Sequence, residues 1–213
     1  MSQQDSLKII IVGDIYTGKT NILNRYIYDS FTNSYKLRKG ATYDLKKIEL
    51  DYSEINLSIY DISGIEKFGN MTKLYYKSAS CAFIVVDVNN KKTLLNALEW
   101  KKDIDSKVQF PNIEIPIPII LLVNKIDECE DKLNKYCGKT FEEMDNFCKQ
   151  NSFETWFGVS AKKNINIDLA FDTLVQSALN YKKEIDEIEL LATFSFLDKF
   201  PNPFEKFNTF LLT

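Results

Sequence analysis

Residues 13–20 read Gly13-Asp14-Ile15-Tyr16-Thr17-Gly18-Lys19-Thr20 and fit the pattern G-x-x-x-x-G-K-[ST]. They directly follow an apolar run, residues 7–12, that is typical of a buried strand. In this context the pattern predicts a phosphate-binding loop, because its glycines let successive backbone N–H groups point at phosphate oxygens. The helix that begins near Gly18 adds its positive dipole end. A glycine-containing turn that binds nothing is the alternative, and it is disfavoured because strand, loop and helix all fall where the motif requires.

The loop predicts two specific roles. Lys19 is expected to reach the outer phosphates and to serve in catalysis, and the Thr20 hydroxyl is expected to bind Mg²⁺. The residues predicted to contact the nucleotide in this segment are Ile15, Tyr16, Thr17, Gly18, Lys19, Thr20 and Asn21.

The composition is that of a globular protein of 213 residues, with 27% charged and 45% hydrophobic residues. Its net charge of −3 gives no electrostatic footprint for nucleic acid, so no such partner is expected. The four cysteines form no C-x-x-C pair and are typical of reduced cytosolic thiols. No histidine is present, which excludes imidazole bases and His-ligated metals. We expect neither a secretory leader nor a membrane span.

Apolar runs alternate with helical patterns, which predicts an α/β fold with a six-stranded, mostly parallel sheet and helices on both faces. Strands are expected at 7–13, 43–50, 55–61, 81–87, 117–123 and 155–159. Helices are expected near 19–29, 66–78, 91–107, 140–150 and 166–182. The connection 51–54 is too short for a crossover helix, so the two strands it joins should form an antiparallel hairpin. In such open sheets ligands bind beyond the carboxyl ends of the strands.

The strand 55–61 ends at Asp61, three residues before Gly64. A carboxylate at this strand end, facing the phosphate-binding loop, is suited to hold Mg²⁺ through water, and the Gly64 N–H is suited to approach a γ-phosphate in catalysis. Alone, D-x-x-G usually makes a simple turn. The phosphate-binding loop upstream favours the metal role.

Two further motifs follow strands and predict which base is bound. Strand 117–123 leads to Asn124, Lys125 and Asp127, and strand 155–159 leads to Ser160, Ala161 and Lys162. The Asp127 carboxylate can accept hydrogen bonds from guanine N1–H and from its 2-amino group, which adenine lacks, so discrimination of ~10⁴ or more is expected. The stem of Lys125 can cover the base, and the Ala161 N–H can bond guanine O6. Each motif alone is weak, but four in order at strand ends are specific.

With these motifs the chain resembles the Ras superfamily of small GTPases, and within it the Rab family, over about residues 7–182. Residues 68–79 are similar to Rabs that serve lysosome-related organelles. The resemblance implies the P-loop NTPase, small G-protein fold, GTP/GDP binding with Mg²⁺, and vesicular transport as the setting. It also implies effector, exchange-factor or activating proteins that bind through residues 32–44 and 64–78. Phe31 matches the aromatic residue that stacks edge-on against guanine; from the residues alone, a core or exposed aromatic is an equal reading.

The resemblance further implies a monomer in the cytoplasm, peripheral to endolysosomal or vesicle membranes through its partners. Residues 183–213 are expected to be an aromatic-rich extension of a G domain at 1–182. The family's tails usually end in prenylated cysteines, and no such motif is expected here. The aromatic side chains of the extension should pack on the G domain, on a partner, or open a further domain.

Three features depart from the family pattern, all near the γ-phosphate. Ile65 stands where a glutamine normally orients the attacking water, which predicts a GTP phosphohydrolase of low intrinsic rate. Ile15 and Tyr16 occupy loop positions that are usually small, so they crowd the γ-phosphate and the entry of an activating arginine.

The third departure is in the first switch, where Arg38 falls at the place of a Mg²⁺-ligating threonine. A guanidinium carries donors only and cannot ligate a cation. A shifted register would bring Thr42 to that place instead, but it moves Gly40 off its match, so Arg38 is preferred. Arg38 is then either a charge-assisted partner of a phosphate oxygen or a solvent-exposed side chain on a loose loop.

The sequence therefore predicts a Rab-like guanine-nucleotide switch with slow GTP hydrolysis. One rival is a pseudo-GTPase scaffold that holds GDP as a structural ligand without switching. Another is a P-loop ATPase or kinase, which Asp127 argues against.

Overall fold

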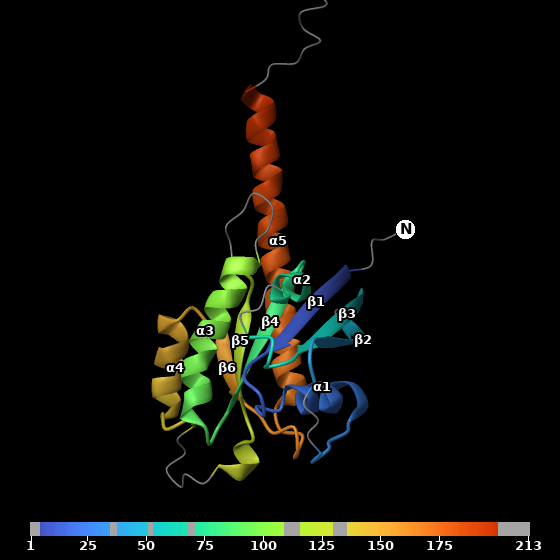
Figure 1. Cartoon of the computed structure of the whole chain (residues 1–213). Helices are drawn as coiled ribbons and strands as arrows, with labels where there is room; N and C mark the ends of the chain where they lie inside the picture. Colours follow the sequence, from blue (N-terminus) through green and yellow to red (C-terminus); the bar gives the residue numbers. More distant parts are fainter. Residues whose placement is uncertain are drawn as a thin grey trace, which may run out of the picture. The chain divides into compact units, whose positions relative to one another are not determined.

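A six-stranded sheet with the order β2-β3-β1-β4-β5-β6 carries the fold (Figure 1). The computed structural model describes residues 5–34, 38–50, 53–67, 71–108, 116–129 and 136–199. The strands are β1 (Asp5–Val12), β2 (Ala41–Leu50), β3 (Ser53–Ile62), β4 (Cys81–Asp87), β5 (Ile119–Asn124) and β6 (Thr155–Gly158). Only β2 runs antiparallel to its neighbour, so the predicted hairpin and the mostly parallel sheet are confirmed.

The helices are α1 (Lys19–Tyr28), α2 (Thr72–Tyr76), α3 (Lys91–Lys107), α4 (Phe141–Gln150) and α5 (Ile167–Lys199). A short 3₁₀ helix, η1, spans Ile126–Glu128 and was not predicted. Thr140 caps α4 in a capping box with Glu143, and the Asn90 side chain caps α3 by accepting from the Lys92 N–H. These caps explain why α3 and α4 begin within one residue of the expected positions.

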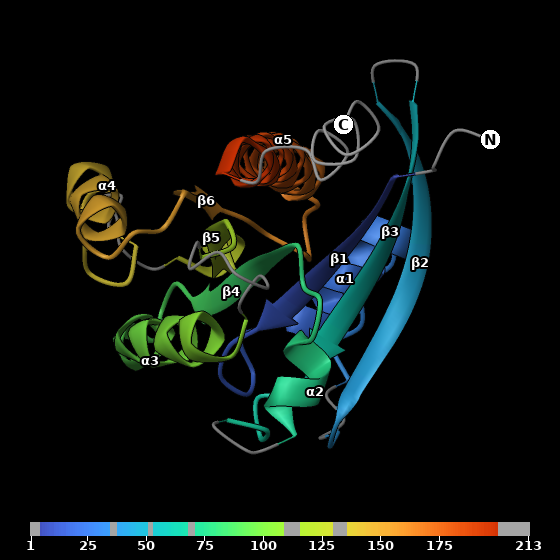
Figure 2. The ribbon, with the colours of Figure 1, turned by 90° about the horizontal axis from the view of Figure 1, so that it is seen from above.

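Alternation along β1 divides the core into two layers, as Figure 2 shows from above. Ile10 and Val12 belong to a buried cluster with Trp100 of α3 and Met144 of α4. On the opposite face, Tyr26 of α1 stacks on Phe171 of α5, with ring centroids 3.6 Å apart. Helices therefore cover both faces of the sheet, as expected for the α/β class.

Two helices differ from the prediction. The helix α2 ends at Tyr76, before the expected end at residue 78, because Lys77 leaves the helical region and Ser78 has φ +59. It begins at Thr72, and residues 68–70 of the expected helix lie outside the described residues. The helix α5 continues to Lys199, well past residue 182, because no proline or glycine interrupts the sequence before Pro201. The break expected at Pro201-Asn202-Pro203 lies outside the described residues.

The chain divides into two compact units, Met1–Ala178 and Leu179–Thr213, and the described part of the second is helical from Leu179 to Lys199. The predicted boundary at residue 182 stays a prediction. Among the described helices, none combines the length and the apolar character needed to cross a bilayer.

Candidate nucleotide-binding site

The loop after β1 is shaped by two glycines that no other residue could replace. A Cβ on Gly13, which has φ +141, would lie 2.3 Å from the Val85 carbonyl oxygen of β4. A Cβ on Gly18, with φ +96, would lie 2.2 Å from the side-chain nitrogen of Asn124. The glycines therefore allow the loop to press against β4 and β5, and α1 begins directly after Gly18. Its first-turn N–H groups and dipole favour an anion at this point.

Lys19 lies under this loop and holds it together. Its ammonium donates to the carbonyl oxygens of Gly13 at 2.9 Å and Asp14 at 2.7 Å. Burial lowers the pKa of Lys19 to about 8, and the charges of Asp61 and Asp14 oppose that shift. A phosphate brought to this ammonium would add a further negative charge that favours its charged form.

Thr20 and Asp61 meet as the metal prediction requires. The Thr20 hydroxyl donates to Asp61 Oδ2 at 2.5 Å. The other carboxylate oxygen, Oδ1, is buried and has no hydrogen-bond partner among the described residues. Burial raises the pKa of Asp61, while the Thr20 hydrogen bond and the charges of Lys19 and Arg38 oppose the shift. A hydroxyl and an unsatisfied carboxylate oxygen are hard donors, so these residues fit Mg²⁺.

Asn124 joins the phosphate loop to the predicted base site. Its side-chain nitrogen donates to the Thr17 carbonyl oxygen at 2.9 Å, and its side-chain oxygen accepts from the Ala161 N–H at 3.3 Å. Asn124 is 2% exposed, so both bonds are shielded from water. The spacing between the two halves of the site is thereby fixed by one buried side chain.

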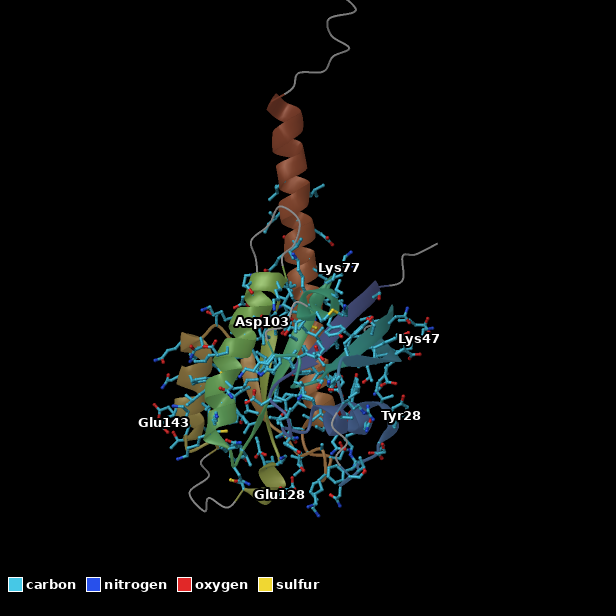
Figure 3. All side chains as sticks on the ribbon, viewed as in Figure 1. Tyr28, Lys47, Lys77, Asp103, Glu128 and Glu143 are labelled. Carbon is cyan, nitrogen blue, oxygen red and sulfur yellow. The ribbon has the colours of Figure 1, made fainter. Side chains whose placement is uncertain are left out.

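The base-binding residues gather where β5 and β6 end. Asp127 Oδ1 accepts from the Ser160 hydroxyl at 2.6 Å, and Oδ2 lies 3.9 Å from the Lys162 ammonium. Lys125 has φ +67, and its ammonium pairs with Asp87 at 2.5 Å. Figure 3 shows Glu128, the next residue of η1 after Asp127, at the end of the sheet opposite Lys77. The structure thus brings together all six residues of the two base motifs.

The predicted γ-phosphate side is open by comparison. Ile15, Tyr16 and Ile65 are 41%, 57% and 40% exposed. Gly64 packs on the phosphate loop, since a Cβ there would lie 2.4 Å from the Ile15 nitrogen. Of these three side chains, Tyr16 belongs to the wall of the cavity described below, whereas the crowding expected from Ile15 and Ile65 stays a prediction.

Asn21 anchors the chain that leaves α1, because its side chain bonds both the N–H and the carbonyl of Thr32. Phe31 precedes this anchor and is half-buried. Its stacking on guanine stays a prediction. Residues 35–37 and 68–70, in the two predicted switches, lie outside the described residues.

A cavity of about 230 Å³ adjoins the phosphate loop. Its wall includes Lys19, Thr20 and Asp61 together with both candidates for the first switch, Arg38 and Thr42. Thr42 lies within β2 opposite Asp61 of β3, whereas Arg38 lies in the loop before β2. Both residues therefore face the nucleotide region, and lining the cavity does not choose between them.

Sequence reasoning missed a polar network around Asp14. This carboxylate accepts from the indole N–H of Trp100 at 3.0 Å and from the amide of Asn96 at 2.5 Å, both on α3. It also pairs with Lys67 of the second switch at 3.5 Å. The available signal was a tryptophan on a buried helix face, because a buried indole N–H needs an acceptor.

The fold and these residues define a P-loop nucleotide-binding protein with a guanine-type base site. The Ras family model matches residues 8–180. Ras-related protein Rab-32 of Homo sapiens is 38% identical over 197 residues, covering 89% of this chain and 85% of the relative. Rab-32A of Dictyostelium discoideum is 44% identical over 173 residues, covering 81% and 77%. Rab-7L1 of Homo sapiens is 38% identical over 186 residues, covering 86% and 88%.

The chain belongs to the Ras family, as a Rab-type small GTPase. The predicted family, the G-protein fold and the assignment as a GTP-binding protein of vesicular transport are thereby confirmed.

Proposed function

We propose that this protein binds GDP and GTP with Mg²⁺, hydrolyses GTP slowly, and signals through residues 32–44 and 64–78. The observation that carries the proposal is the bridge made by Asn124 between the Thr17 carbonyl and the Ala161 N–H. It sets a phosphate site and a guanine site at one fixed separation. A nucleoside di- or triphosphate with a guanine base satisfies both sites at once.

Thr20 and Asp61 would hold the Mg²⁺ ion, Asp61 through water. The ion supplies positive charge that neutralises the β- and γ-phosphate oxygens. The unsatisfied Asp61 Oδ1 supports this assignment. Lys19 places a second positive charge at the same phosphates, and the N–H groups of the loop and of α1 orient them.

Slow hydrolysis is proposed because no group at position 65 can orient a water molecule. The Ile65 side chain offers neither donor nor acceptor, and it is 40% exposed rather than packed away. Tyr16 and Ile15 crowd the same place. Catalysis then depends on positioning and charge from Lys19, the Gly64 N–H and the loop.

The proposed signal is a change in the order of the two switch segments with the number of phosphates. Exchange factors, activating proteins and effectors would read that order. We further propose that the protein acts as a monomer, in the cytoplasm or at endolysosomal or vesicle membranes that it reaches through these partners.

The test is to denature the purified full chain and to identify the released nucleotide by chromatography. A second sample is first incubated for hours with GTP and Mg²⁺. We expect guanine nucleotide at about one equivalent, with GTP converted to GDP far more slowly than by a glutamine-bearing relative assayed alongside. Release of adenine nucleotide, or no nucleotide and no guanine preference in competition, would overturn the proposal.

Binding affinities and hydrogen exchange, measured on the same protein, address the pseudo-GTPase rival. That reading predicts GDP in the first sample, similar affinities for GDP and a GTP analogue, and unchanged hydrogen exchange in residues 38–50 between the two forms. A switch predicts slower exchange in the triphosphate form.

A further inference from the structure

The second switch holds the backbone around Arg38 in place. The Ser63 hydroxyl donates to the Arg38 carbonyl oxygen at 2.6 Å, and the Ser63 N–H donates to the Gly40 carbonyl oxygen at 3.0 Å. The Gly40 N–H donates to Glu66 Oε1 at 2.8 Å. Three hydrogen bonds thus join residues 38–40 to residues 63–66. The loop that carries Arg38 is therefore fixed by protein groups.

Arg38 is among the residues that line the 230 Å³ cavity, together with Lys19, Thr20, Asp61 and Gly64. Within the part of the chain that the structure describes, its guanidinium makes no hydrogen bond and no ion pair. Its positive charge opposes the upward shift that burial causes in the pKa of Asp61. The Arg38 guanidinium is therefore a strong hydrogen-bond donor beside the phosphate loop that has no acceptor among the described residues.

The chemistry of this group selects its ligand. A guanidinium offers planar donors that match two oxygens of a phosphate, whereas it cannot coordinate a metal ion. The α- and β-phosphates are the natural ligands of the loop and of the α1 N-terminus. The phosphate beyond Lys19 is the one that remains for a residue on the first switch.

We propose that Arg38 binds the γ-phosphate of GTP directly, so that the first switch recognises the triphosphate through a guanidinium. This inference rests on the proposed function, since it requires a guanine nucleotide in the site. It assigns the protein a way to distinguish GTP from GDP in which the first switch makes no contact with Mg²⁺. Ser63 and Glu66 are positioning residues for Arg38.

The experiment measures affinities of the nucleotide-free full chain for fluorescent GDP and for a non-hydrolysable GTP analogue. Each is measured with Mg²⁺ and with excess EDTA. Arg38→Ala should lower the affinity for the analogue by about 10- to 100-fold, which is the value of a hydrogen-bonded charge pair. It should change the affinity for GDP by less than about threefold. Metal removal should weaken the binding of both nucleotides, but the selective effect of Arg38→Ala on the analogue should persist in EDTA, because the guanidinium contact does not involve the ion.

The matched control is Lys39→Ala, which removes the neighbouring exposed cation from the same cavity wall. It should lower the affinities for both nucleotides slightly and by the same factor. Arg38→Lys should recover only part of the lost analogue affinity, because an ammonium lacks the planar fork. Ser63→Ala should cause a smaller loss in the same direction as Arg38→Ala.

Several outcomes would overturn the inference. One is an equal effect of Arg38→Ala on both nucleotides; another is an effect no larger than that of Lys39→Ala. A selective loss of analogue binding in Thr42→Val, with Arg38→Ala unchanged, would assign the role to Thr42. Retained GDP binding in each variant shows that it is folded. If the wild type binds neither nucleotide, the proposed function fails, whereas GDP binding with an inert Arg38 refutes only this inference.

Discussion

The two halves of the nucleotide site are built differently. In the base half, Asn124, Ser160 and Ala161 are at most 2% exposed. Asn124 bonds the phosphate loop and the Ala161 N–H, and the Ser160 hydroxyl donates to Asp127. In the γ-phosphate half, Ile15, Tyr16 and Ile65 are all at least 40% exposed and bring apolar or aromatic bulk. We propose that guanine recognition depends on the first half, whose side chains are preorganised, and that hydrolysis is slow because Ile65 offers no polar group in the second half.

The largest expected effect is the loss of guanine recognition in Asp127→Ala. We expect the affinity for GDP to fall by about 10²- to 10⁴-fold, because two charge-assisted hydrogen bonds to the base are lost. Titration with fluorescent GDP measures it. Glu128→Ala is the control, since it removes an adjacent carboxylate that is 51% exposed and should change affinity less than about threefold. Equal affinities for GDP in the two variants would show that Asp127 does not bind the base.

The next effect is on folding. Asn124→Ala leaves the Thr17 carbonyl and the Ala161 N–H buried without their partner, so we expect a loss of about 2–4 kcal/mol in the free energy of unfolding. Urea denaturation of the nucleotide-free protein measures it. Asn151→Ala removes one local bond to the Phe147 carbonyl at the end of α4 and should cost only about 1 kcal/mol. Equal losses would show that the bridge has no special stabilising role.

Ile65→Gln tests the γ-phosphate half of the site. A glutamine restores a donor and an acceptor, so we expect GTP turnover to rise by about tenfold, less than the 10²- to 10⁴-fold of a well-placed proton-transfer group, because Tyr16 still crowds the site. Single-turnover hydrolysis measures the rate. Ile65→Ala is the control for bulk. A gain in the alanine variant as large as in the glutamine variant would mean that crowding, and not the missing polar group, limits the rate.

Much of this comparison could be predicted from the sequence, because strand ends and motif spacing are local properties. The base motif after β5 needs only a buried apolar run followed by Asn124 and Asp127. The bounds of α3 also follow from local signals, since Asn90 caps it and its periodic buried residues end at Ile104, in the last turn before Lys107.

The features that could not be predicted from the sequence depend on contacts between distant segments. No local pattern shows that Asn124 reaches the Thr17 carbonyl, 107 positions away, or that Asp14 meets Trp100. The predicted second-switch helix, 66–78, extended too far at its C-terminal end, because Ser78 adopts φ +59, which no local pattern indicates. The hydrogen bond from the Ser63 hydroxyl to the Arg38 carbonyl oxygen could not be predicted either, because it joins two loops that are distant in the sequence.

The smallest effect concerns how firmly the γ-phosphate half is attached to the rest of the domain. Lys67 of the second switch pairs with Asp14 at 3.5 Å, and the two side chains are 26% and 17% exposed. A pair this long and this accessible to solvent should contribute about 0.5 kcal/mol, so Lys67→Ala should lower the free energy of unfolding by about that amount and less at high salt. Urea denaturation at low and at high ionic strength measures it, with Lys102→Ala on the exposed side of α3 as the control.

A loss above about 2 kcal/mol for Lys67→Ala would place this lysine in a buried network and would remove the contrast between the two halves. If Lys67→Ala causes only the expected small loss, the Asp14 carboxylate holds the phosphate loop on α3 through its bonds to Trp100 and Asn96. The second switch then contacts that loop through the weak Lys67 pair and the packing of Gly64, and it is joined to the first switch through Ser63 and Glu66. The two switch segments are therefore expected to move together, away from a phosphate loop that stays fixed.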